Sequence, residues 1–209
     1  MLAKGKIYER ATMTPALKSK FVNQIEKIAW QYKLSPETIN LPSTPAVPEI
    51  QVFNILLKGD DIDEVLLRTI DKVIPYPIYF QLIKQRKVKV KAAYKHPSET
   101  KGNSWLIETY LETEWLDIET PTAPLPIALD LEKLYDLMLK SLMPNEIVEQ
   151  SPESSIKDQV DKLSQWQTKE KAYERLKAKR DKEKQFNRKI ELNTQLKQLK
   201  KELEQIKAG

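Results

Sequence analysis

The sequence predicts an α+β protein, with a mainly antiparallel sheet of about four strands, helices packed on that sheet, and a long C-terminal helical or coiled-coil arm. Apolar residues alternate with charged ones over 105–115, which is typical of a half-buried strand. Candidate elements follow in the order helix, strand, helix, three strands, helix, which favours helices on an antiparallel sheet. No proline or glycine stands between Pro152 and Gly209, which favours long helices.

An amphipathic helix is expected near the N-terminus. Thr14 and Pro15 suit an N-cap and the first helical position, and apolar residues recur at helical spacing over 17–34. Prolines between 36 and 48 then indicate an extended connection. This connection leads to Ile50–Leu57, where β-branched and aromatic residues predict a buried strand.

A second helix and a hairpin are expected next. Apolar residues over 66–74 have helical spacing, with Asp60 or Asp61 as the cap, and the helix must end before the proline that follows. Short apolar runs at 78–83 and 88–94, separated by polar residues, predict a β-hairpin.

The strand over 105–115 has two distinct faces, and a helical stripe over 131–142 follows it. One face of the strand is apolar and the other is acidic because side chains alternate along a strand. The apolar set is Trp105, Ile107, Leu111 and Trp115, and the acidic set is Glu108, Glu112 and Glu114.

The distribution of charge, and of proline and glycine, divides the chain into a globular domain (1–145), a linker (146–155) and a basic helical tail (156–209). Residues 1–150 hold 19 Lys and Arg against 20 Asp and Glu, a net charge of −1. Residues 151–209 hold 16 against 10, a net charge of +6, so the tail supplies the whole positive excess of the chain.

The tail has coiled-coil spacing at both ends but not in its middle. Ile156, Val160 and Leu163 begin it, and apolar residues at alternating spacings of three and four end it. In the middle the two frames disagree, which indicates either a stutter in one rod or a fold-back near 184–188. Because two arms of one chain can pack on each other, the heptads do not require a dimer, although a homo-oligomer through the tail stays open. The candidate partner-binding residues are Phe186, Ile190, Leu192, Leu196, Leu199, Leu203 and Ile206.

Several chemistries are excluded by what the chain lacks. The four glycines are scattered, so neither a P-loop nor a dinucleotide-binding turn is present. The chain has no Cys and one His, so zinc sites built on those ligands and thiol nucleophiles are not expected. We therefore expect no cofactor and no resident metal. We also expect a cytoplasmic protein, since no apolar run is long enough to span a bilayer and no secretory signal is seen.

Two basic stretches are candidate nucleic-acid surfaces, because cations that displace counterions dominate such binding. The alternative for the hairpin stretch is ordinary pairing of Lys89 and Lys91 with the acidic face of the neighbouring strand. The alternative for the tail stretch, Lys169–Lys189, is a solvated helix with internal ion pairs. The candidates are Lys84, Arg86, Lys87, Lys89, Lys91 and Lys95 in the hairpin, and Lys177, Lys179, Arg180, Lys184 and Arg188 in the tail.

The sequence contains no complete set of catalytic residues for the enzyme classes considered. A metal-dependent nuclease needs two acids and a lysine that converge at a phosphate. The E-x-K triplet Glu99–Lys101 stands in a turn-rich stretch, with Asp71 and Glu108 as possible partners. His96 lacks the nucleophile elbow of a serine hydrolase, and a surface-loop histidine is the expected alternative. No catalytic residue is assigned.

Five segments stand out, in order along nearly the whole chain: 21–30, 34–42, 70–80, 113–116 and 184–193. The most distinctive are the connection LSPETINLP and the tail segment KQFNRKIELN. Together the five segments resemble the bacterial domain-of-unknown-function family 4391.

The resemblance implies a role rather than a mechanism. Similar proteins are encoded beside DNA methyltransferases and helicase-type ATPases, in clusters that resemble restriction–modification or antiviral defence systems, and fold alone does not give function. We therefore expect a non-enzymatic accessory subunit that docks on a helicase or methyltransferase. A nucleic-acid-binding protein that uses the basic patches is the alternative, and a divergent metal-dependent nuclease is the third hypothesis.

Overall fold

The computed structural model describes residues 7, 10–98, 104–145, 147 and 155–208. The chain divides into two compact units, Met1–Leu142 and Met143–Gly209. The expected linker at 146–155 lies almost entirely outside the described residues. Among the helices that are described, none is long and apolar enough to cross a membrane.

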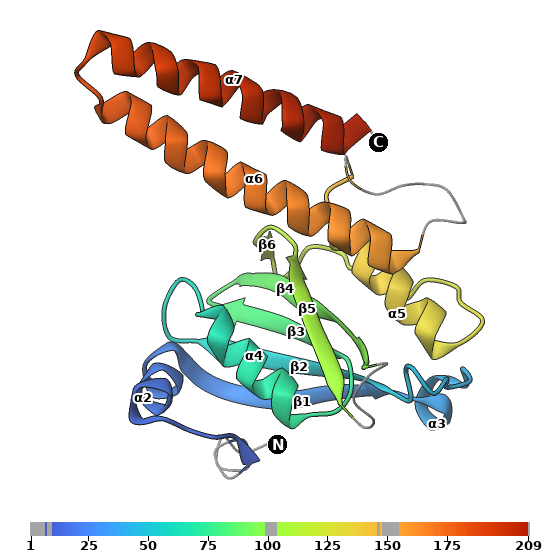
Figure 1. Cartoon of the computed structure of the whole chain (residues 1–209). Coiled ribbons are helices and arrows are strands. Elements are labelled where there is room, and N and C mark those ends of the chain that lie inside the picture. Colours follow the sequence, from blue (N-terminus) through green and yellow to red (C-terminus); the bar gives the residue numbers. More distant parts are fainter. Residues whose placement is uncertain (1–6, 8–9, 99–103, 146, 148–154, 209) are drawn as a thin grey trace. The chain divides into compact units, whose positions relative to one another are not determined.

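The first unit is built on a mixed sheet of six strands (Figure 1). Five strands lie in the order β1-β2-β3-β4-β5, and the short β6 pairs with β4. β2 and β3 are parallel, whereas the other pairs are antiparallel. The strands are β1 (Ile25–Leu34), β2 (Ile50–Leu57), β3 (Ile78–Lys84), β4 (Lys87–Pro97), β5 (Trp105–Glu112) and β6 (Leu116–Asp117).

The expected sheet was therefore too small and too uniform. The α+β class is confirmed, but the sheet has six strands where about four were predicted, and it is mixed. β3 lies parallel to β2 because α4 (Glu64–Val73) joins the two strands, and a helical crossover brings the chain back to the same end of the sheet.

The helix predicted over 14–34 is confirmed only in its first part. α2 (Pro15–Gln24) begins as expected, with the Thr14 hydroxyl accepting from the Leu17 N–H at 3.2 Å, but it ends at Gln24. The next ten residues form β1, the edge strand paired with β2. The register shifts after Ile25, so Ile25 and Ile28 are both buried although they are three residues apart. The bulge therefore produces in a strand the spacing that is typical of a helix.

The other expected elements of the first unit are present: β2, α4, the β3–β4 hairpin, β5 and α5 (Leu131–Lys140). The N-cap of α4 is Asp63 and not Asp60 or Asp61, and β5 ends at Glu112 and not at 115. A short helix, α3 (Pro36–Ile39), interrupts the proline-rich connection before β2. The core lies between the sheet and helices α2 and α4, around Phe53, Phe80 and Leu67. α4 and α5 each bury one apolar face, which explains why their spacing was readable in the sequence.

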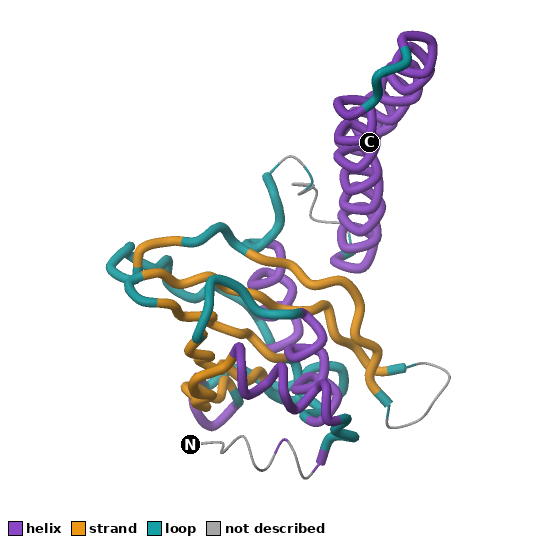
Figure 2. The backbone as a smooth tube through the Cα atoms, turned by 90° about the vertical axis from the view of Figure 1, so that its left-hand side faces the viewer, coloured by secondary structure: helices purple, strands orange, loops and turns teal. Residues whose placement is uncertain are grey.

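The second unit is a helical hairpin of α6 (Ile156–Lys182) and α7 (Phe186–Ala208). The two helices run side by side and are joined by a turn at 183–185 (Figures 1 and 2). Of the two alternatives for the tail, the fold-back near 184–188 is therefore the one observed. The Glu183 carboxylate stabilises the turn by accepting from the Lys184 and Gln185 N–H groups at 2.8 and 2.9 Å.

Candidate functional site

The lysines of the β3–β4 hairpin are bound to acids of the same sheet. Glu112 of β5 accepts from Lys89 at 3.0 Å and from Lys91 at 2.8 Å, and Lys91 also lies 3.6 Å from Glu64 of α4. Burial raises the pKa of Glu112, but the two ammonium groups outweigh it, and the net pKa is lowered. Lys89 and Lys91 therefore form the cross-strand ion pairs that were predicted as the alternative to nucleic-acid binding. Glu114, on the same acidic face, forms no ion pair among the described residues.

The cations close to the turn of the β3–β4 hairpin also form ion pairs with acids. Lys84 contacts Asp60 at 3.0 Å and lies over the Trp115 ring at 4.7 Å. Arg86 contacts Glu119 at 2.7 Å. Lys87 is exposed and, within the described part of the chain, is without an ion pair. Of the six hairpin candidates, only Lys87 thus presents an unpaired charge.

Lys95 is the clearest correction to the sequence-based surface, because it is not on the surface at all. It is 2% exposed. Its Nζ donates to the carbonyl oxygens of Asp71 at 2.6 Å and Tyr76 at 3.0 Å, and also to that of Ile74. The Asp71 carboxylate lies 3.6 Å away. The ammonium group therefore satisfies carbonyls at the C-terminal end of α4, where the helix dipole favours a cation.

Asp71 shares this buried site with two tyrosines. The Tyr110 hydroxyl donates to Asp71 Oδ2, the Tyr135 hydroxyl of α5 donates to the Ala93 carbonyl, and the Lys95 N–H donates to Tyr135 at 3.1 Å. Burial raises the pKa of Asp71 to about 6 and outweighs the opposite effect of Lys95. Burial also lowers the pKa of Lys95 and raises the pKa of both tyrosines. With every group bonded inside the fold and closed to solvent, the arrangement holds α4 and α5 to the sheet.

The position of Asp71 in the sequence indicates a buried ion pair, although no such pair was predicted. Asp71 follows Ile70 directly and lies four residues after Leu67, which places a carboxylate on the apolar face of α4. A buried acid requires a cation or several donors nearby. The bulge where β4 meets β5, between Ala93 and Lys95, supplies that cation in a register that sequence spacing does not give.

The enzymatic candidates do not converge into a described site. Glu99 and Lys101 lie outside the described residues. Asp71 is buried, and Glu108 lies 3.3 Å from His96, whose ring stacks on Tyr94. Among the described residues, no group of three or more acids or histidines is arranged to hold a metal ion.

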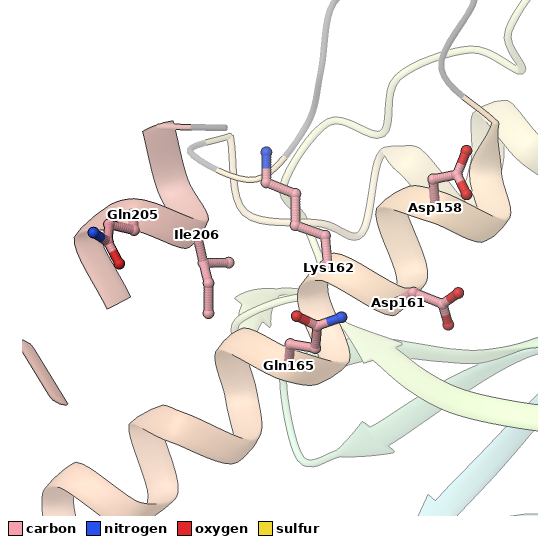
Figure 3. A pocket seen from close by; sticks show the side chains of 6 residues that line it. All are labelled: Asp158, Asp161, Lys162, Gln165, Gln205 and Ile206. Carbon is pink, nitrogen blue, oxygen red and sulfur yellow. The ribbon is translucent and has the colours of Figure 1, made fainter. Parts of the chain in front are cut away.

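The apolar seam predicted for the tail is used within the hairpin. Leu192 and Leu196 are buried, and Leu199, Leu203 and Ile206 are partly buried. Lys169 of α6 bonds to Glu202 of α7 across the seam, and Figure 3 shows Ile206 pointing toward α6, above a shallow hollow. The hollow is lined by Asp158, Asp161, Lys162, Gln165, Gln205 and Ile206. Leu192 and Leu196 therefore have no free face for a partner helix, which corrects the prediction for these two residues.

The tip of the α6–α7 hairpin differs from its seam. Phe186 is 76% exposed and Ile190 is 50% exposed, one turn apart on the first part of α7. Residues 175–189 hold eight Lys and Arg against two acids, so the net charge of this segment is +6. We call residues 175–190 the hairpin tip. Its candidate cations are all on the surface except Arg180, which is partly buried.

A second exposed feature lies in the first unit, between β6 and α5. Residues 121–129, which we call the apolar segment, carry no charge and form neither helix nor strand. Ile127 is 98% exposed, Leu129 86% and Leu125 50%. None of the peptide groups in this segment has a hydrogen-bond partner among the described residues. The prolines at 121, 124 and 126 favour an extended backbone.

The comparisons with known proteins give a family and no activity. No curated protein matches the chain, and no solved structure does. The family described as "Domain of unknown function (DUF4391)" matches residues 1–203, nearly the whole chain, in agreement with the resemblance of the five segments. The chain therefore belongs to the DUF4391 family of domains of unknown function.

Proposed function

We propose that this protein is a non-enzymatic accessory subunit that docks on a larger protein of a bacterial DNA-processing or defence complex, with a helicase-type ATPase or a DNA methyltransferase as the partner. The observation that carries the docking role is the apolar segment 121–129. The genomic neighbourhood of similar proteins, as the resemblance implies it, supplies the class of partner.

The apolar segment has the properties of a docking element rather than of a connecting loop. Isolated exposed apolar side chains are common on protein surfaces, whereas several together mark an interaction site. Here Leu125, Ile127 and Leu129 alternate along an extended chain. Burying three such side chains against a partner would contribute roughly 1.5–3 kcal/mol each. Their unbonded peptide groups are free to pair with a strand edge of that partner.

The side chains of the described residues support a docking role over catalysis. Three titratable groups with strongly raised pKa values, Asp71, Tyr110 and Tyr135, are buried and bonded to one another or to the backbone. Burial also raises the pKa of Asp136 to about 6, and this carboxyl of α5 is partly buried. A catalytic acid or base must be within hydrogen-bond reach of a substrate. The buried groups of this fold instead hold helices to the sheet.

Co-purification from cells that express the neighbouring genes together tests the proposal. The wild-type chain is expected to recover a helicase-type or methyltransferase protein, and Ile127→Asp with Leu129→Asp is expected to lose it. A matched control replaces Val22 and Val65, which are about half exposed on α2 and α4, by Asp. Recovery of the wild-type chain alone, or equal loss with both pairs of substitutions, would reject the docking role.

A further inference from the structure

Of the eight cations of the hairpin tip, five form no ion pair among the described residues. Asp181 is held by Arg180 at 2.6 Å, and Glu183 caps the turn and lies 3.7 Å from Arg188. Lys177 contacts Glu174 at 3.6 Å. Both acids of the tip are thereby occupied. Within the described part of the chain, the tip cations that form no ion pair are Arg175, Lys179, Lys182, Lys184 and Lys189.

The unpaired cations lie on the outer surface of the hairpin. Arg175, Lys179 and Lys182 are spaced by four and three residues, so they share one face of α6. All three are exposed, whereas Tyr173 and Leu176 are partly buried on the side of α6 that lies toward α7. Neighbouring side chains at this spacing have Cβ atoms about 5–6 Å apart. The result is a row of closely spaced exposed cations, of which Lys179 also helps to lower the pKa of Glu183.

Phe186 adds an aromatic surface at the end of this row. It is the first residue of α7 and directly follows the turn that carries Lys184. Its ring is largely exposed, and Ile190 widens the apolar surface by one turn. An acidic protein helix would use the cations and could cover Ile190, but it would not require the flat face of the Phe186 ring. An unpaired base stacks on an aromatic ring while its phosphates contact the cations around it.

We infer that the hairpin tip binds single-stranded nucleic acid, with backbone phosphates on Arg175, Lys179, Lys182 and Lys184 and a base stacked on Phe186. In a duplex the faces of the bases are already stacked on each other, so Phe186 has no base to contact. Discrimination between single strand and duplex therefore comes from Phe186, and most of the affinity comes from the cations. This binding is independent of the docking proposed for the apolar segment.

Fluorescence anisotropy with the full chain and a labelled oligothymidylate of about 20 nucleotides tests the inference, with a duplex of equal length beside it. The wild-type chain is expected to bind the single strand more tightly than the duplex. Charge reversal by Lys179→Glu, Lys182→Glu and Lys184→Glu is expected to weaken binding roughly tenfold or more and to reduce the salt slope of log K by about 0.7 per lost contact. Phe186→Ala is expected to weaken single-strand binding about tenfold and to leave duplex binding unchanged.

The matched control reverses three exposed lysines of the first unit, Lys18, Lys27 and Lys58, so that the net charge changes equally. This control is expected to lose less than about threefold in affinity. Circular dichroism checks that each variant keeps its helices. The inference is overturned by absent binding of the wild-type chain at about 50 mM salt, by equal losses in the two triple variants, or by duplex binding as tight as single-strand binding. Equally tight binding of polyglutamate would indicate a surface for acidic proteins and would overturn it as well.

Discussion

Both the β3–β4 hairpin and the tip of the α6–α7 hairpin collect lysine and arginine, yet their cations stand in different surroundings. In the sheet, Lys89 and Lys91 reach Glu112 on the neighbouring strand, and Lys95 is buried beside Asp71. At the hairpin tip, the two acids are occupied by the turn and by neighbouring arginines. The first cluster holds the fold together, and the second remains available to a ligand.

The difference follows from geometry rather than composition. A strand pair places side chains of two strands directly opposite each other, so an acidic β5 beside a basic β4 pairs its charges across the sheet. A long two-helix hairpin has one seam, and the described lysines on the outer faces of its tip are exposed. Cations on those faces keep their charge unpaired unless an acid lies one turn away on the same helix.

The largest expected effect concerns the paired cluster. Lys95→Met leaves Asp71 buried without its cation and three carbonyls without a donor, so we expect a loss of about 3–5 kcal/mol in the free energy of unfolding at pH 7. Urea denaturation measures it. Lys87→Met, a lysine without an ion pair in the same hairpin, serves as the control and is expected to change stability by less than about 0.5 kcal/mol. A loss below about 1 kcal/mol for Lys95→Met would mean that Lys95 is not buried as described.

The pH dependence of stability tests the same site through Asp71. Its pKa is about 6 in the folded chain and 3.8 in an ordinary environment, so the folded state binds the proton more tightly. The resulting contribution is fully present below pH 3.8 and is lost as the pH rises through about 6, with a size on the order of 3 kcal/mol. Urea denaturation from pH 4 to 7 is expected to show a larger loss in the wild type than in Asp71→Asn, in which Asp136, whose pKa burial also raises to about 6, still titrates. Parallel curves for the two proteins would contradict the raised pKa.

The cross-strand pairs are expected to contribute less. Glu112→Gln removes the acid that Lys89 and Lys91 share, and we expect a loss of about 1 kcal/mol that shrinks as salt is added. The neighbouring Glu114→Gln is the control, because Glu114 forms no ion pair among the described residues. Equal effects of the two substitutions on the urea midpoint would show that the sheet does not depend on these pairs.

The smallest effect on stability is expected at the hairpin tip. Lys179→Gln, Lys182→Gln and Lys184→Gln together should leave the free energy of unfolding within about 0.5 kcal/mol, or raise it slightly, because unpaired like charges repel one another. Thermal unfolding followed by circular dichroism measures this. A clear destabilisation would place these lysines with the structural cations of the sheet and would remove the contrast between the two regions.

Several elements were predictable because their determinants are local. Thr14 and Pro15 start α2, and apolar stripes mark the buried faces of α4 and α5. The alternation in β5 and the two runs of the β3–β4 hairpin also matched the structure. The charge counts located the basic tail, and the exposed Phe186 and Ile190 were among its predicted candidates.

The errors arose where the determinant lies far away in the sequence. Ile25 and Ile28 have helical spacing, but pairing with β2 and a bulge make them part of a strand. Lys95 looked like the continuation of a surface row until its register with β5 placed it beside Asp71. The apolar segment was not among the predicted sites, because exposure of its side chains is not visible in one sequence.

By itself, the sequence determined which segments are helices or strands wherever periodicity and caps agree, where the positive charge collects, and which cofactor-binding motifs are absent. Only the tertiary structure decided which charges are neutralised and which apolar residues stay exposed, since both depend on residues brought together from distant positions. The two lysine-rich stretches differ for this physical reason: the sheet places acids opposite one of them, whereas the described lysines on the outer faces of the helical hairpin tip are exposed.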